Sequence, residues 1–173
     1  MTLTVTPGSA TADSYASLAA ALAYHAAKGN AAWATAIDAN REPALRRATA
    51  WVDMAYRGRW SGYRVYGRVQ ALDWPRSGVV DLEGYTVDYL TIPPEVLNAT
   101  CEAALRELAS VGSLTPDYIA SQQVKTAAAG PVNVTFKDGS GSASIAPILM
   151  VVDGLLARLL GPRSRNTVEL VRA

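Results

Sequence analysis

The chain has 173 residues, of which half are hydrophobic and 18% are charged, and its formal net charge at pH 7 is +1. This length allows one compact domain with a buried core, and the near-neutral charge argues against a protein that coats nucleic acid over its whole surface. The single Cys101 excludes an internal disulfide and a multi-cysteine metal site, and the single His25 excludes a multi-histidine site. No stretch resembles a transmembrane helix or a signal peptide, so we expect a protein that is made in the cytosol.

Apolar periodicity and turn residues predict the elements of the first half of the chain. Residues 2–6 alternate like a strand and stop at Pro7-Gly8. A helix capped by Asp13 or Ser14 should then run to Gly29. Residues 31–36 indicate a short helix, and a longer one capped by Asn40 should end at residues 57–58.

Residues 59–92 mix Gly, aromatic, Arg and β-branched residues with several turn signals, which predicts an extended excursion with one hairpin. Pro93-Pro94 should begin a helix that ends near Val111. Alternating apolar residues in 122–136 indicate short strands, and a last helix is expected from about Pro147 to Gly161. The expected fold is therefore mainly α: a small helical bundle over residues 1–113 with the excursion inserted, and a C-terminal arm over residues 114–173 with short strands and one helix.

The sequence contains no recognisable catalytic or cofactor motif. Gly139-Ser-Gly-Ser lacks the Lys-Ser/Thr pair of a phosphate-binding loop, and His25 has no nucleophile motif to serve. Carboxylates such as Asp81 and Glu83 fit solvated turns better than an acid–base pair. We therefore expect no enzyme activity, no metal and no cofactor.

One segment has the composition of a binding surface. Arginine forks bind phosphates and aromatic faces stack on bases, but the same residue types are also enriched at protein–protein interfaces. The near-neutral net charge favours the protein interface over a groove for single-stranded DNA. The candidate interface residues are Arg57, Arg59, Trp60, Tyr63, Arg64, Tyr66, Arg68, Trp74 and Arg76.

Several local strings, in order and spacing, resemble a known group of proteins. The chain is similar over roughly residues 11–112 to phage head–tail connector or adaptor proteins, a branch of which is described as DnaT-like single-stranded DNA-binding proteins. The strings are Asp13-Ser-Tyr, Ala23-Tyr-His, Gly29-Asn-Ala-Ala-Trp33, Glu42-Pro-Ala-Leu-Arg-Arg-Ala48, Asp53, Gln70-Ala-Leu-Asp-Trp-Pro-Arg-Ser-Gly78 and Ile92-Pro-Pro-Glu-Val96, followed by a helix with Glu102, Ala103, Leu105 and Leu108.

The resemblance implies a structural subunit of a tailed bacteriophage virion. It implies assembly as a ring, commonly of twelve copies, bound to the portal protein and leading to a stopper or tail-completion protein. Arginines that line the channel of such a ring are an open alternative for transient contact with packaged DNA, and from the sequence we expect no membrane partner. The C-terminal arm, with Val168, Leu170 and Val171, would dock on the portal, although a hairpin folded back on the body would explain its pattern equally well.

Two hypotheses follow. The chain is a head–tail connector at the head–tail junction, which we expect, or it is a single-stranded DNA-binding accessory protein of phage replication that uses residues 57–76. They differ in salt response, because nucleic-acid binding weakens steeply with salt and an aromatic interface does not.

Overall fold

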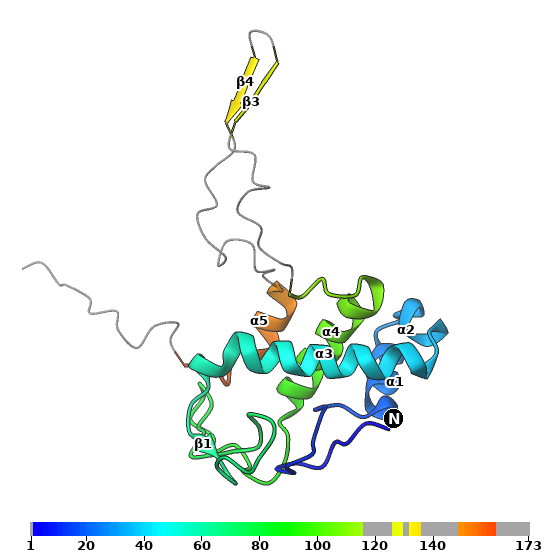
Figure 1. Cartoon of the computed structure of the whole chain (residues 1–173). Coiled ribbons are helices and arrows are strands. Elements are labelled where there is room, and N and C mark those ends of the chain that lie inside the picture. The colour runs from blue at the N-terminus through cyan, green and yellow to red at the C-terminus, as the bar shows by residue number, and fades with distance from the viewer. Residues whose placement is uncertain (1, 116–125, 130–131, 136–148, 162–173) are drawn as a thin grey trace, which may run out of the picture.

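The computed structural model describes residues 2–115, 126–129, 132–135 and 149–161, and in these ranges the chain is mainly helical, as predicted (Figure 1). In chain order the elements are α1 (Leu18–Ala27), α2 (Ala31–Thr35), α3 (Asp38–Tyr56), a 3₁₀ turn (Arg57–Arg59), β1 (Tyr63–Arg64), β2 (Arg76–Ser77), α4 (Pro94–Ala109), β3 (Thr126–Ala129), β4 (Val132–Thr135) and α5 (Met150–Leu156). One pair of short strands lies between α3 and α4, and a second pair lies between α4 and α5.

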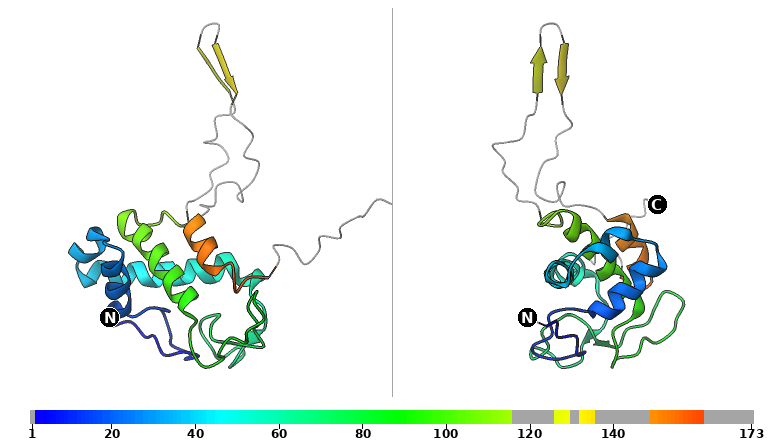
Figure 2. Two further views of the ribbon diagram at one scale, coloured as in Figure 1. Left: turned by 180° about the vertical axis from the view of Figure 1, so that it is seen from behind. Right: turned by 90° about the vertical axis from the view of Figure 1, so that its right-hand side faces the viewer.

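The core lies between α3 and the helices that pack around α4. Helix α4 contacts α3 and α5 most extensively and also touches α1 and α2, and Figure 2 shows the same arrangement from two further sides. Small residues such as Ala48 on α3 and Ala103 on α4 are fully buried, which lets the two helix backbones approach closely. Leu45, Val52 and Val96 fill the remaining volume.

Two helix starts differ from the prediction, and at the first of them the expected cap Asp13 has other partners. Helix α1 begins after Ser17, whose hydroxyl accepts a hydrogen bond from the Ala20 amide at 3.1 Å. Asp13 instead binds the Thr4 amide at 2.8 Å and Arg46 at 2.6 Å. Helix α3 begins at Asp38 rather than after Asn40.

The N-terminal strand prediction was wrong. Residues 2–12 contain turns and extended backbone without strand pairing. This segment is held instead by a reciprocal pair of hydrogen bonds, because Asp13 also donates its amide to the Thr4 carbonyl at 2.9 Å. The Ser9 carbonyl accepts from the Ala71 amide at 3.2 Å, so the N-terminal segment lies along the excursion.

The excursion over residues 59–92 contains the predicted hairpin. Strands β1 and β2 are antiparallel, with Tyr63 opposite Ser77 and Arg64 opposite Arg76. The chain between them makes two close turns, and the Trp74-Pro75 peptide bond is cis. A second antiparallel bridge joins Val80 to Thr86.

Residues 149–161 pack against the helical body, with α5 in contact with α4. Leu156 on α5 is fully buried, and Leu160 pairs with Trp60 in a β-bridge. The Tyr56 hydroxyl donates to Asp153 at 2.9 Å, and the Gly161 amide donates to the Arg59 carbonyl at 2.9 Å. In the other part of the expected arm, β3 and β4 form the predicted short strands, paired antiparallel.

Candidate nucleic-acid interface

The nine predicted interface residues differ in burial: the two tryptophans are buried, three of the arginines are half-buried, and the remaining four residues are exposed. Trp60 and Trp74 are only 4% and 1% exposed, and their rings meet edge to face with centroids 5.5 Å apart. They therefore anchor the excursion in the core and do not lie on its exposed face. Arg59 is half-buried and lies 3.6 Å from the Asp153 carboxylate, so it also joins the excursion to α5.

A buried polar network fixes the excursion on α3. The Tyr15 hydroxyl donates to Asp53 and accepts from the Trp74 amide at 3.1 Å, while the Asp73 amide donates to the second oxygen of Asp53 at 3.0 Å. Burial raises the pKa of Asp53 to about 6, and the negative charge of Asp73 contributes to this rise. Burial also raises the pKa of Tyr15 well above its usual value. The turn at residues 73–75 is thus held by groups that lie well before it in the chain.

An arginine-lined pocket opens beside the hairpin, with a volume of about 420 Å³. Three arginines and one carboxylate line it, and the carboxylate, that of Asp73, is nearly buried and accepts a hydrogen bond from Arg57 Nε at 3.0 Å. The Arg57 side chain is otherwise 66% exposed. The pocket is lined by Arg57, Gly62, Tyr63, Arg64, Asp73 and Arg76.

The three arginines of this pocket have different roles. Arg76 donates to the carbonyls of Ser61 at 2.7 Å and Gly62 at 2.7 Å, so it staples the two strands together. Burial lowers the pKa of Arg76, and the nearby charge of Arg64 lowers it further. Arg64 donates one hydrogen bond to the Gln70 carbonyl at 3.1 Å, and its other N–H groups can bind a ligand.

Exposed aromatic rings and a further arginine lie beside the pocket. Tyr63 is 66% exposed and Tyr66 is 53% exposed, so both rings can offer a face to a partner. Arg68 is exposed in the turn that follows Tyr66, and among the described residues no carboxylate lies within ion-pairing distance of it. Together these residues can bind an anion and stack on planar groups.

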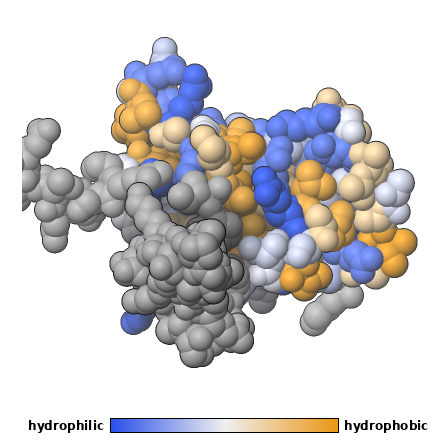
Figure 3. All heavy atoms as spheres, turned by 90° about the horizontal axis from the view of Figure 1, so that it is seen from above, coloured by the Kyte–Doolittle hydropathy of each residue, from blue (hydrophilic) through white to orange (hydrophobic). Residues whose placement is uncertain are grey.

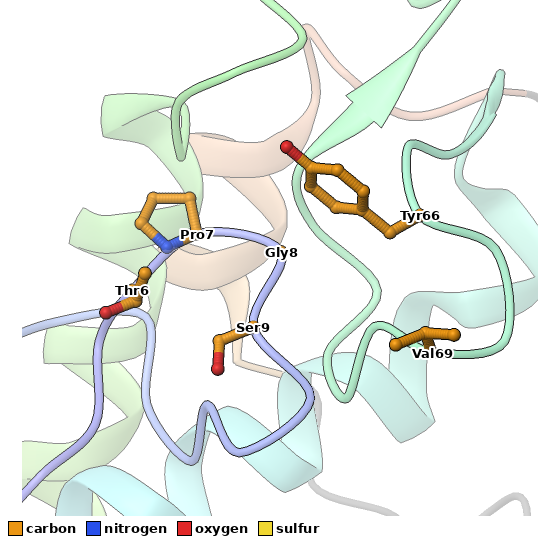
Figure 4. A pocket seen from close by; sticks show the side chains of 6 residues that line it. All are labelled: Thr6, Pro7, Gly8, Ser9, Tyr66 and Val69. Atoms are coloured by element: carbon orange, nitrogen blue, oxygen red, sulfur yellow. The ribbon is translucent and has the colours of Figure 1, made fainter.

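A second hollow lies between this turn and the N-terminal segment, with a volume of about 380 Å³ and a mostly apolar lining. Figure 4 shows the Tyr66 ring reaching from the excursion toward the Pro7-Gly8 turn. We refer to this hollow as the Tyr66 groove; it is lined by Thr6, Pro7, Gly8, Ser9, Tyr66 and Val69. The sequence analysis missed the N-terminal part of this groove, because Pro7-Gly8 indicates only a turn and not its neighbour in space.

The remaining candidate residues show no comparable arrangement. His25 is buried against Trp33, with ring centroids 4.5 Å apart, and burial lowers its pKa. Burial raises the pKa of Cys101 to about 12. In the described ranges no group of three or more His, Cys, Asp or Glu could hold a metal ion, and no helix is long and apolar enough to cross a membrane. Val168, Leu170 and Val171 lie outside the described residues.

The face of the helical body seen in Figure 3 is neither uniformly hydrophobic nor uniformly hydrophilic. Hydrophobic residues form separate patches between hydrophilic ones on the part of this face that is not covered in grey (Figure 3). On the excursion, by contrast, exposed aromatic rings and an exposed arginine lie together.

Comparison with known proteins corrects the expected function. The whole chain, residues 1–173, matches the family described as "Putative DnaT-like ssDNA binding protein". No curated protein and no solved structure matches the chain significantly. The expectation of a head–tail connector in a virion was wrong, because the matching family is described by single-stranded DNA binding and nothing found supports a connector. The match does agree with the DnaT-like branch named above, and the chain belongs to the family described as "Putative DnaT-like ssDNA binding protein".

Proposed function

We propose that the chain binds single-stranded DNA through the exposed face of the excursion. In this proposal Arg57, Arg64 and Arg68 contact the phosphate backbone, and Tyr63 stacks on a base. The observation that carries the proposal is the arginine-lined pocket, whose lining contains three arginines and a single, nearly buried carboxylate.

The charge balance of the pocket favours an anion. Arg76 is held in place by backbone carbonyls, and Arg64 lies close enough to lower its pKa. A phosphate bound between these groups would relieve the repulsion between their like charges. Arginine also binds phosphate through two parallel hydrogen bonds, which gives a fixed geometry to the contact.

The exposed rings favour a single strand over a duplex. A base can stack on Tyr63 only when it is unpaired and turned out of a helix, and the excursion offers a short hairpin rather than a helix that fits a groove of duplex DNA. Stacking is tolerant of base identity, because every base has an aromatic face. The proposal therefore predicts binding with little sequence preference.

The test is the salt dependence of binding to a labelled oligothymidine, measured by fluorescence anisotropy. Arg64→Gln and Arg68→Gln should each weaken binding, and each should reduce the slope of log K against log salt by about 0.7, the value for one phosphate contact on a single strand. The matched control is Arg106→Gln, since Arg106 is also exposed but lies on α4 outside the excursion.

Circular dichroism of each variant would confirm that its helical content is unchanged. The proposal is refuted if the wild-type chain does not bind the oligonucleotide at physiological salt, or if Arg106→Gln weakens binding as much as the two excursion variants. Equal affinity for duplex and single-stranded DNA would contradict the part of the proposal that rests on Tyr63.

A further inference from the structure

We infer that the Tyr66 groove is a subsite for one unpaired nucleobase of the bound strand. This inference rests on the proposed function and adds to it a second, separate binding position, formed jointly by the N-terminal segment and the excursion.

The shape and lining of the groove fit a flat, mostly apolar group. Its volume of about 380 Å³ lies within the range of small-ligand sites, ~300–1,000 Å³. Tyr66 supplies an aromatic wall that is 53% exposed, and Pro7 and Val69 supply aliphatic surface. In Figure 4 these three side chains come from two segments on either side of one hollow.

The groove is held in shape before any ligand arrives. The Tyr66 ring lies so close over Gly8 that a Cβ atom there would be 2.2 Å from one of its carbons. The Ser9 amide donates to the Thr6 carbonyl at 3.2 Å, which closes the turn beneath the ring. Gln70, which is buried, accepts from the Tyr66 amide at 3.4 Å and donates to the Pro75 carbonyl at 3.1 Å. A preformed site loses less conformational entropy on binding, which favours affinity.

The Ser9 hydroxyl of the groove is occupied within the chain. The Ser9 hydroxyl is 3.1 Å from the Thr11 hydroxyl and accepts from the Thr11 amide at 3.1 Å. It therefore has little capacity to read the edge of a base. The groove should accept a base by stacking and apolar contact, with weak discrimination between bases.

Charge beside the groove identifies the ligand as part of a nucleic acid rather than an apolar peptide. Arg68 lies two residues after Tyr66 in the same turn, and Arg64 lies two residues before it. Residues two apart are at most about 7 Å apart along the backbone, so a base in the groove would place its phosphate within reach of a guanidinium group. An apolar peptide would leave both guanidinium groups without an anionic group to pair with.

The test compares two strands of equal length: oligothymidine and a strand with the same phosphates in which every residue is abasic. The wild-type chain should bind oligothymidine about fivefold or more tightly than the abasic strand, since stacking contributes that much per base. Tyr66→Ala should reduce this ratio by about fivefold or more while leaving affinity for the abasic strand unchanged, and Tyr66→Phe should retain the ratio because the ring remains.

A second variant addresses the groove without removing the ring. Gly8→Ala should displace the Tyr66 ring and reduce the ratio in the same direction, because the new Cβ atom cannot coexist with the ring in its present position. Gly29→Ala is the matched control: its φ of +70° imposes the same backbone strain, but nothing lies within 4 Å of the added Cβ atom. Gly29→Ala should leave the ratio unchanged.

The outcomes separate this inference from the proposed function. Equal wild-type affinity for the two strands, with a normal salt slope, would overturn the base subsite and leave the phosphate contacts standing. Absence of binding to either strand would overturn both. Self-association of the wild-type chain that is lost in Tyr66→Ala, with DNA binding unaffected, would assign the groove to a protein contact and overturn the subsite.

Discussion

The buried carboxylate of Asp53 accepts hydrogen bonds from two donors and lies near a second carboxylate, that of Asp73. It lies on α3, is 4% exposed, and accepts hydrogen bonds from Tyr15 and from the Asp73 amide. These hydrogen bonds lower its pKa, but burial and the charge of Asp73 outweigh them and raise the pKa to about 6. Folding therefore opposes the ionisation of a residue that holds the excursion in place.

The first prediction concerns the pH dependence of stability. The folded-state pKa of Asp53, about 6, is above its ordinary value of 3.8, so the proton is held more tightly in the folded chain. The stability contributed by neutral Asp53 is fully present below about pH 4 and is lost as the pH rises through about 6, by about 2 to 3 kcal/mol in total. Urea unfolding of the wild type and of Asp53→Asn at several pH values would measure it.

The difference between the two chains isolates Asp53 from other carboxyl groups, such as Glu107, whose pKa is lowered by hydrogen bonds and Arg47 despite its burial. The wild type should lose stability relative to Asp53→Asn between pH 4 and pH 7. A constant difference over this range would show that Asp53 does not titrate there.

The second prediction compares two glycines of the excursion. Gly62 and Gly67 have positive φ values of 64° and 57°. A Cβ atom on Gly62 would be 2.2 Å from the Ser77 carbonyl oxygen, whereas one on Gly67 would meet nothing within 4 Å. Gly67→Ala should cost about 1 to 2 kcal/mol, the strain of a left-handed residue, and Gly62→Ala should cost clearly more because it also separates β1 from β2. Equal losses in urea unfolding would contradict this packing of the hairpin.

At the scale of elements, α5 illustrates how a late segment completes an early core. Its Val152 and Leu156 are buried, and Tyr56 on α3 donates a hydrogen bond to its Asp153. The same region meets the excursion, since the Leu82 amide donates to the Arg158 carbonyl at 3.1 Å. Helix α5 therefore supports both the helical core and the base of the proposed DNA-binding surface.

The third prediction tests this role of α5. Leu156→Ala should lower the free energy of unfolding by about 2 to 5 kcal/mol, because a fully buried leucine is replaced by a cavity. Met150→Ala in the same helix is the control: Met150 is 81% exposed, so its loss should change stability by less than about 0.5 kcal/mol. Similar effects of the two substitutions would place α5 outside the core.

Those parts of the fold that depend on local signals were predictable from the sequence. Pro94 at the start of α4, the end of α3 near Arg57, and α2 around Trp33 all follow from periodicity and from Pro or Gly. The start of α1 was misplaced because Asp13 binds Arg46, a partner 33 residues away. The place of α5 likewise depends on contacts between distant residues, which no local pattern contains.

The candidate site was predictable in composition but not in the roles of its residues. The clustering of arginines with aromatic residues indicated a binding surface, and Tyr63 and Tyr66 are indeed exposed. Trp60 and Trp74, by contrast, are buried, and Arg76 donates its hydrogen bonds to backbone carbonyls. These distinctions depend on the packing of the excursion against α3, which residue types alone do not specify.

At the scale of the whole molecule, the fourth prediction concerns where the chain can be shortened. A chain that ends at Gly161 retains every core residue named above and should unfold cooperatively in urea. A chain that ends at Thr115 lacks Leu149, Val152, Leu156, Leu159 and Leu160, all of them buried, and should lose cooperative unfolding. A sharp transition in the shorter chain would show that α3 and α4 with their neighbours are stable alone.

The bridge between Trp60 and Leu160 also bears on the order of events during synthesis. The ribosome completes residue 60 about 5 to 20 s before residue 160, at ~5–20 residues per second. During this interval the indole of Trp60 has no Leu160 beside it, and α4, once it has been made, has no α5 to cover it. The nascent chain therefore presents an apolar surface that a chaperone can recognise, and fragments released before α5 has been made would be aggregation-prone.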